Sequence, residues 1–241
     1  MIDNSLIDKL QNCHKNVKIA YGGDGTLAGV WREAYAKKMP IWPIRNYGMC
    51  DRHQKMLTAL INDDKASFKD MQFKMSIHQL AESNATVSGE RQLALNEIQV
   101  KNRNITEALR FDVYVNGKKF YENVIADGIL FATPNGATGY WKSITRTMFR
   151  DGCGLAFISP TVGISSLVLK ATDSIKLKLV RDADIVMSHD KIVEDKHFDA
   201  GSEFDFRMSA ENISIVGYEH FMCFDCRKNR NSTILQDQYI V

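Results

Sequence analysis

The residues with the clearest chemical potential form a glycine-rich pentapeptide, Gly22-Gly23-Asp24-Gly25-Thr26, between an apolar run and a helical pattern. The glycines let the backbone turn tightly and approach a ligand closely. A helix that begins at this loop directs its first N–H groups and the positive end of its dipole towards it, which suits phosphate. Phosphate would repel the central acid unless Asp24 holds a metal ion or accepts a proton from an attacking hydroxyl group.

The pentapeptide also has a simpler interpretation. A strand-to-helix turn in which an aspartate caps the helix favours the same residue types. The segment has no G-K-S/T and is therefore not a Walker loop, and it is not the G-x-G-x-x-G fingerprint of dinucleotide-binding folds. Residues 22–26 alone leave both phosphate binding and a plain turn open.

The elements that must position the loop predict an α/β unit. Residues 17–21 and 40–44 are short apolar runs typical of strands. Between them, apolar residues from Leu27 to Tyr35 recur at steps of three and four, which indicates a helix face. Residues 52–79 also favour helix, with a charged and irregular pattern. This order of elements is typical of a parallel sheet.

From about Val87 onward the pattern predicts a β-rich domain. One strand is expected over residues 93–100, and Asn116-Gly117 predicts a tight hairpin after residues 111–115. Further short strands are expected at residues 155–158, 167–169, 175–179, 185–187, 204–206 and 213–216. So many strands in series indicate a sandwich or a barrel.

Composition excludes several classes of protein. The 31 Lys+Arg against 29 Asp+Glu give a formal charge of +2, without the basic excess that nucleic-acid binding needs. No apolar run approaches the roughly 18 residues of a membrane helix, and the first residues lack the apolar core of a signal peptide. The five cysteines are odd in number and scattered, unlike a disulfide scaffold. We expect a reduced, cytoplasmic protein.

A second unusual segment runs from Asp127-Gly128 through Thr133-Pro134-Asn135-Gly136-Ala137-Thr138-Gly139 to Tyr140. It leads from an acid at a strand start into a loop rich in small hydroxyl and amide residues. Such groups can hydrogen-bond the edge of a base, and a tyrosine offers a stacking face. A hydroxyl-rich turn beside a core tyrosine would explain any one of these residues equally well.

Taken together, the two segments and Leu95-Asn96-Glu97 resemble the NAD kinase family in motif, order and spacing, over roughly residues 17–217. The resemblance implies an N-terminal Rossmann-like α/β domain (residues 1–84) carrying the GGDGT loop, then a β-rich, sandwich-like NAD-binding domain (residues 85–222). Residues 223–241 would form a tail that returns to the first domain. The implied reaction transfers a phosphate from ATP to the adenosine-ribose 2′-hydroxyl of NAD, which gives NADP.

The resemblance also implies residue roles. Asp24 would be the general base, and Gly22, Gly23, Gly25 and Thr26 would hold phosphates. Contacts to NAD would come from Gly25, Asn96, Glu97, Asp127, Asn135, Thr138, Gly139, Tyr140 and Asp190. Of these, Asn96 and Glu97 would bind ribose hydroxyls and diphosphate, Asp127 the nicotinamide amide, and Asp190 would lie near the reacting ribose; the loop ending at Tyr140 would hold the adenosine.

Mg²⁺ is expected with ATP, without a tightly bound organic cofactor, and the family implies a homodimer or homotetramer. Residues 45–50 are one of the departures from the family pattern. They contain an arginine and lack the usual G-x-N-x-G-x-LGFL segment, which suggests a rebuilt loop.

Cys223 and Cys226, with His220 before them, have zinc-like spacing but no clear fourth ligand, so we expect free thiols and no metal site.

Two other functions stay open. Lipid kinases of the diacylglycerol or sphingosine type share a GGDGT loop and a β-rich second domain, but they lack the loop at residues 133–140. A nucleotide-binding sensor without turnover would explain the altered residues 45–50, although the retained Asp24 argues against it. Comparing turnover of the wild type with Asp24→Asn separates a kinase from a sensor.

Overall fold

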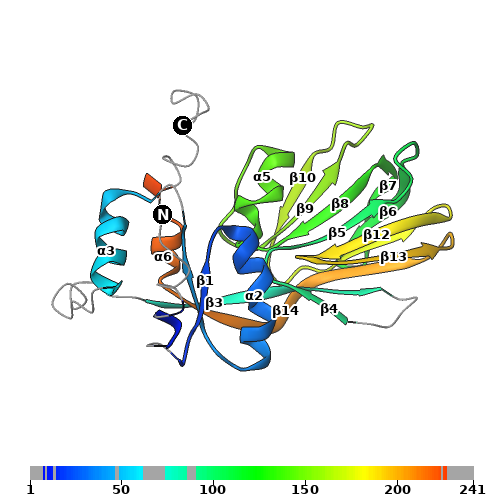
Figure 1. Cartoon of the computed structure of the whole chain (residues 1–241). Helices are drawn as coiled ribbons and strands as arrows, with labels where there is room; N and C mark the ends of the chain where they lie inside the picture. The colour runs from blue at the N-terminus through cyan, green and yellow to red at the C-terminus, as the bar shows by residue number, and fades with distance from the viewer. Residues whose placement is uncertain are drawn as a thin grey trace. The chain divides into compact units, whose positions relative to one another are not determined.

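The computed structural model describes residues 8, 10–12, 15–46, 49–61, 74–85, 91–223 and 225–226 (Figure 1). Residues 47–48 of the altered loop, and the expected tail from Arg227 onward, lie outside this description. The chain divides into two compact units: Met1–Ile77 with Ile213–Val241, and His78–Asn212. The first division precedes the expected boundary at residue 84, because β3 (Met75–Ala85) pairs with β4 (Arg91–Ala94) from Ala81 to Asn84.

The first unit contains the expected β–α–β arrangement. Strand β1 (Lys18–Tyr21) and strand β2 (Ile41–Ile44) pair in parallel. Helix α2 (Asp24–Ala36) joins them and buries Leu27, Ala28, Trp31 and Ala34. The spacing of these side chains at three and four residues explains why this segment is a helix with one apolar face. The last residues of β14 (Glu203–Val216) also pair in parallel with β2, Ile215 opposite Ile41.

Two further helices with defined bounds belong to this unit. They are α3 (Asp51–Ile61) and the short α6 (Tyr218–Phe221). The expectation of helix over residues 52–79 is confirmed from Arg52 to Ile61 and wrong from Met75 onward, where β3 begins; residues 62–73 lie outside the described part of the chain. Exposure alternates along the start of β3, a period of two that only an extended strand produces. No described helix is long and apolar enough to span a bilayer.

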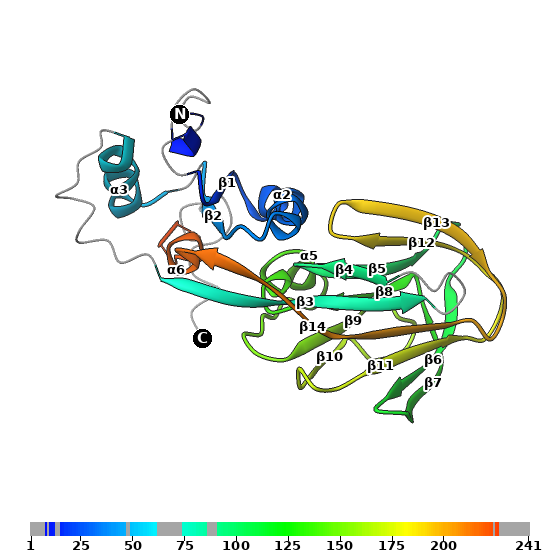
Figure 2. The same ribbon diagram turned by 90° about the horizontal axis from the view of Figure 1, so that it is seen from below.

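The second unit is built from two antiparallel sheets. The six-stranded sheet has the order β10-β9-β8-β5-β12-β13 (Figure 2). Its strands are β5 (Glu97–Asn102), β8 (Gly128–Ala132), β9 (Cys153–Ile158), β10 (Ser166–Leu169), β12 (Ala183–His189) and β13 (Ile192–Phe198). The facing sheet has the order β14-β11-β6-β7, with β3 beside β14 and β4 beside β3. Its other strands are β6 (Leu109–Val115), β7 (Lys118–Ala126) and β11 (Ile175–Leu179).

The core of this unit lies between the two sheets, as expected for a sandwich. The Phe111 ring on β6 stacks on Phe157 of β9, with centroids 6.3 Å apart. Phe131 of β8 and Phe206 of β14 make a second contact across the sheets, at 5.7 Å. All four rings are buried, so the inward faces form one apolar layer that holds the sheets together.

The strand predictions were partly right. The Asn116-Gly117 hairpin is confirmed, with positive φ at both residues (50° and 76°) as a type I′ turn requires. The single strand expected over residues 93–100 is wrong: β4 ends at Ala94 and β5 begins at Glu97. Residues 204–206 and 213–216 belong to one strand, β14, rather than two.

Candidate functional site

The glycine loop joins β1 to α2 in the first unit. Gly22 has φ of 157°, and a Cβ there would lie 2.1 Å from Oγ1 of Thr26, so the tight turn requires a glycine. Its N–H donates to the carbonyl of Ile44 at 2.8 Å, which secures the loop to the end of β2. This N–H is therefore not available to a phosphate, and Gly22 shapes the loop instead of donating to a ligand.

Gly23 caps α2, and Asp24 is the first residue of the helix. The N–H groups of a first helical turn have no carbonyl partner within their own helix, so they can meet an anion. The N–H of Thr26 bonds the Gly23 carbonyl at 3.0 Å. The backbone at Asp24 and Gly25 is thus the part of the loop best suited to a phosphate, next to the carboxylate expected to act as base.

Arg45 lies beside Asp24, a contact that the sequence analysis did not predict. Its Nη2 lies 3.2 Å from Oδ1 of Asp24. Its side chain is only 4% exposed, whereas that of Asp24 is 25% exposed. A buried cation beside a partly exposed carboxylate fixes where that carboxylate points and offsets its charge near phosphates.

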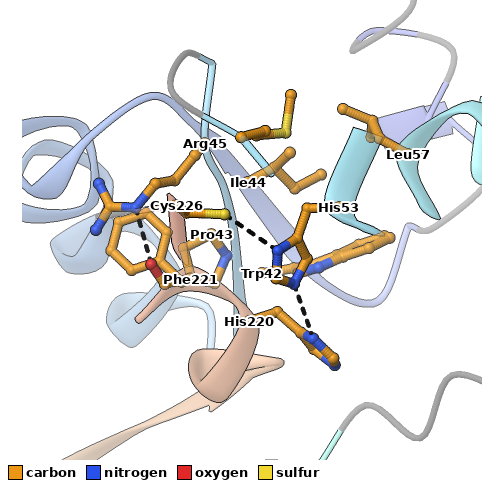
Figure 3. A pocket seen from close by; sticks show the side chains of 10 residues that line it. Trp42, Pro43, Ile44, Arg45, His53, Leu57, His220, Phe221 and Cys226 are labelled. Atoms are coloured by element: carbon orange, nitrogen blue, oxygen red, sulfur yellow. Dashed lines mark hydrogen bonds between the residues drawn. The ribbon is translucent and has the colours of Figure 1, made fainter. Parts of the chain in front are cut away.

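The Arg45 guanidinium is itself held in place by Phe221 (Figure 3). Its Nε donates to the carbonyl of Phe221 at 2.8 Å, and the guanidinium carbon lies 3.9 Å from the centre of the Phe221 ring. Arg45 therefore connects the carboxylate of Asp24 to the segment that follows β14.

In the second unit, Asp190 organises the turn between β4 and β5. Its carboxylate accepts hydrogen bonds from the N–H groups of Leu95 at 2.8 Å and Asn96 at 2.9 Å, with a longer one from Glu97 at 3.5 Å. Asp190 has a left-handed backbone, φ 54°, in the turn between β12 and β13. The turn at residues 95–96, which divides the expected strand, is therefore held by a carboxylate from a distant hairpin.

The loop after β8 packs against the same turn. Oγ1 of Thr133 donates to the Leu95 carbonyl at 2.6 Å and accepts from the N–H of Asn135 at 3.1 Å. Nδ2 of Asn135 donates to Oδ1 of Asn96. The structure thus brings together Asn96, Asn135 and Asp190, three of the residues expected to contact NAD.

Gly136 allows this close approach. A Cβ at this position would lie 2.2 Å from the carbonyl oxygen of Asn96 and 2.9 Å from Oε2 of Glu97. The Glu97 carboxylate therefore lies beside the 3₁₀ turn η1 (Gly136–Thr138). At Gly139, by contrast, a Cβ would make only an ordinary 3.5 Å contact, so packing does not require a glycine there.

Tyr140 begins α5 (Tyr140–Thr145), and Lys101 is its partner. Nζ of Lys101 lies 3.0 Å from the tyrosine hydroxyl oxygen and 4.7 Å from the ring centre. The part-buried ring keeps an aromatic surface near the loop. Lys101 was not expected at the site, and only its position in β5, opposite Gly128, brings it there.

Asp127 lies at the other end of β8. It is exposed in the turn before this strand, whereas Thr133 and Asn135 follow its last residue. Five residues of strand span about 16 Å. Within one chain, Asp127 is therefore distant from Asn96 and Asn135. The Tyr140 hydroxyl lies nearer to Asp127, because its partner Lys101 is opposite Gly128, the residue after Asp127.

The expected site residues are divided between the units. Asp24 and the glycine loop belong to the first, and Asn96, Glu97, Asp127, Asp190 and residues 135–140 belong to the second. Within each unit, hydrogen bonds or an ion pair between the described residues fix the positions of the polar side chains. Their roles towards a nucleotide stay predictions.

Several known proteins resemble this chain in sequence. A bifunctional NADP phosphatase/NAD kinase of Methanocaldococcus jannaschii is 30% identical over 187 residues, which cover 73% of this chain and 32% of that relative. An NAD kinase of Leuconostoc citreum is 27% identical and covers 91% of this chain and 88% of its own length. An NAD kinase of Clostridium botulinum is 23% identical over 74% of this chain and 65% of its own length.

Solved structures share the fold. An NAD kinase of Archaeoglobus fulgidus in complex with ATP superposes with a TM-score of 0.67 at 18% identity, covering 93% of this chain and 94% of that one. Yeast NADH kinase in complex with NADH has a TM-score of 0.66 at 16% identity, and the match covers 94% of this chain and 69% of that one. No protein-family model matches the chain.

Proposed function

Because the chain belongs to the NAD kinase family, we propose that it transfers the γ-phosphate of ATP to the adenosine-ribose 2′-hydroxyl of NAD. The observation that carries the proposal is the Asp24 carboxylate, at the start of α2 and 3.2 Å from the buried Arg45 guanidinium. A carboxylate fixed beside a helix N-terminus combines a proton acceptor with a phosphate-binding backbone. This is the combination that phosphorylation of a hydroxyl group needs.

In the proposed reaction the 2′-oxygen attacks the γ-phosphorus while Asp24 accepts the hydroxyl proton. A bond forms between this oxygen and the phosphorus, the bond from the γ-phosphorus to the bridging oxygen breaks, and ADP leaves. Mg²⁺ enters with ATP as part of the substrate and shields its phosphate charge. Arg45 offsets the negative charge of Asp24, so that phosphates and a carboxylate can occupy one region.

The second unit would bind NAD. Asn96 and Glu97 are proposed to contact ribose hydroxyls and the diphosphate, and Asn135, Thr138 and Tyr140 the adenosine. Asp190 supports the Asn96 turn through its backbone N–H groups, so we assign it a positioning role. Asp127 is proposed to bind the nicotinamide amide. Its distance from Asn96 within one chain supports a homodimer or homotetramer in which Asp127 serves a neighbouring subunit's NAD.

The experiment is formation of NADP from NAD and Mg-ATP, coupled to an NADP-specific dehydrogenase. We expect turnover by the wild type and a loss of about 10²- to 10⁴-fold in kcat for Asp24→Asn. Asp151→Asn, at an exposed carboxylate between α5 and β9, is the matched control and should retain wild-type kcat. NADH and polyphosphate are tested in parallel as acceptor and donor.

The assay also separates the alternatives. Equal inactivity of the wild type and Asp24→Asn, with NAD still bound by both, would refute the kinase proposal in favour of a sensor. Phosphorylation of a diacylglycerol or sphingosine substrate in place of NAD would indicate a lipid kinase.

A further inference from the structure

A cluster of three cysteines and a histidine lies in the first unit, and two of its members, His53 and Cys226, line the same pocket as Arg45 and Phe221. Cys50 immediately precedes α3 and His53 lies in its first turn, whereas Cys223 and Cys226 follow α6. One ligand atom from each of the four residues lies within 4.8 Å of every other. None of the three cysteines is in a disulfide. From this arrangement we propose that Cys50, His53, Cys223 and Cys226 bind one zinc ion.

The distances fit a tetrahedral zinc site. With Zn–S bonds of about 2.3 Å and a Zn–N bond of about 2.0 Å, tetrahedral geometry places sulfurs about 3.8 Å apart and sulfur about 3.5 Å from nitrogen. Sγ of Cys50 lies 3.6 Å from Sγ of Cys226, and Nδ1 of His53 lies 3.2 Å and 3.1 Å from these two sulfurs. Shifts of a few tenths of an ångström bring these three ligand atoms to the tetrahedral distances, and Sγ of Cys223 lies within 4.8 Å of each of them.

The surroundings favour a closed, structural site. His53 is 4% exposed and Cys226 is 1% exposed, and the other two ligands are partly buried. Four protein ligands leave no open position for a substrate, and three thiolates select zinc over magnesium or calcium. The N–H of Cys50 points at Sγ of Cys226, at 3.3 Å, and so stabilises a thiolate there.

His220 would orient the histidine ligand. Nε2 of His53 lies 3.1 Å from Nδ1 of His220, on the side of the ring opposite the cysteines (Figure 3). If His53 binds the metal through Nδ1, its Nε2–H donates to His220. An outer partner of this kind fixes the tautomer and the ring orientation of a zinc-bound histidine. His220 is therefore the hydrogen-bond partner of the histidine ligand and not a ligand itself.

A disulfide is the competing chemistry for these cysteines. A bond between Cys50 and Cys226 would bring their sulfurs from 3.6 Å to about 2.05 Å. It would leave Cys223 and His53 without a shared role, although a ligand atom of each lies within 4.8 Å of both sulfurs. One metal ion accounts for all four side chains, and this explains why the C-x-x-C at residues 223–226 appeared incomplete in the sequence.

The zinc ion would connect the segment after α6 to the start of α3. The two segments meet at a pocket lined by Arg45, His53 and Phe221, among others. Phe221, which lies between His220 and Cys223, accepts the hydrogen bond from Arg45. Arg45 in turn pairs with Asp24. The metal therefore fixes the segment that holds Arg45 against the proposed catalytic base. Only this last consequence rests on the proposed function; metal binding itself does not.

The first test is the zinc content of the full chain purified from cells grown with zinc, measured by plasma mass spectrometry. We expect about one zinc ion per chain. Cys50→Ser and Cys226→Ser should each lose most of it. Cys153→Ser is the matched control, because Cys153 is buried in β9 of the second unit and should leave the zinc content unchanged.

X-ray absorption at the zinc edge of the wild type decides the case even if the variants do not fold. Three sulfur neighbours and one nitrogen neighbour per zinc would support the site. A shell of oxygens and nitrogens alone, no zinc on the purified protein or after titration with Zn²⁺, or a disulfide among these cysteines would each overturn it. A protein that binds zinc in this way but forms no NADP would refute only the proposed function.

Discussion

Nη2 of Arg45 lies 3.2 Å from Oδ1 of Asp24, although the two residues follow different strands of a parallel pair. Asp24 follows β1 and Arg45 follows β2, so both belong to the carboxyl edge of the sheet, where α/β folds bind ligands. The parallel register brings a carboxylate from one strand end to a guanidinium from the next. This pairing gives the glycine loop a second charged group that its own residues do not contain.

We predict that Arg45→Lys lowers kcat for NADP formation by about 10- to 100-fold. A lysine keeps the charge but cannot bond both Asp24 and the Phe221 carbonyl in the same fixed plane. Losing one charge-assisted hydrogen bond removes about 1.5–3 kcal/mol of interaction, which corresponds to this change in rate if it acts at the transition state. Steady-state kinetics with NAD and ATP varied separately measure the effect.

Arg32→Lys serves as the control for this prediction. Arg32 lies on α2 with its guanidinium 4.4 Å from the centre of the Trp31 ring, away from the start of the helix. We expect its kcat to stay within about twofold of the wild type. An unchanged kcat for Arg45→Lys would mean that the ion pair only stabilises the fold.

Much of the fold follows from local patterns. The helical spacing between two short apolar runs predicts the β1–α2–β2 unit, and Asn116-Gly117 predicts a hairpin because both residues tolerate positive φ. The sandwich follows from many short strands in series. Each of these features depends on residues close together in the sequence, where periodicity and turn chemistry are informative.

The remaining features depend on partners far apart in the sequence. The turn that ends β4 at Ala94 is held by Asp190, 94 residues after Asn96. His53 meets Cys226 across 173 positions, so neither C-x-x-H nor C-x-x-C appears complete by itself. The contacts of Arg45 could not be predicted from its neighbours in the sequence, because Phe221, whose carbonyl accepts its hydrogen bond, is 176 positions away. Periodicity carries no information about such pairs.

We predict that Asp190→Ala lowers the free energy of unfolding by about 2–4 kcal/mol and raises KM for NAD. The substitution leaves the N–H groups of Leu95 and Asn96 without their charged acceptor. It also places alanine in a left-handed conformation, which asparagine tolerates better. Asp190→Asn should therefore lose less stability, roughly 1 kcal/mol. Urea unfolding and steady-state kinetics measure the two effects.

Asp173→Ala is the matched control for Asp190. The Asp173 carboxylate also accepts a backbone N–H, from Lys170 at 2.9 Å, but in an exposed turn before β11. We expect a loss of about 1 kcal/mol or less and an unchanged KM for NAD. If Asp190→Ala raised KM no more than Asp173→Ala, the turn at Asn96 would have no part in NAD binding.

A buried carboxylate in the second unit gives a pH-dependent prediction. Glu82 on β3 is 3% exposed, and its oxygens accept hydrogen bonds from Arg207, Arg91 and the Ser209 hydroxyl. Burial by itself would raise the pKa of Glu82, but the hydrogen bonds from Arg207, Ser209 and Arg91 outweigh it and lower the pKa below its ordinary 4.5. The folded protein therefore favours the ionised form.

This lowered pKa sets the direction of the pH dependence. The unfolded chain takes up a proton at Glu82 near pH 4.5, before the folded chain does. The stability that the ionised group contributes is complete above this pH and is lost as the pH falls towards the folded-state pKa. Glu82→Gln should thus cost about 1–3 kcal/mol at pH 7 but much less in acid, where the wild type has lost the same contribution.

Urea unfolding at pH 7 and at about pH 3.5 tests this prediction, with Glu211→Gln as the control. Glu211 also pairs with Arg91, at 3.5 Å, but its side chain is 41% exposed, so solvent screens the pair. Glu211→Gln should therefore lose as much stability on acidification as the wild type, and Glu82→Gln should lose less. If both variants matched the wild type, the acid dependence would arise from other carboxylates. The bonds from Arg91 and Arg207 would then hold β3, β4 and β14 together without depending on the charge of Glu82.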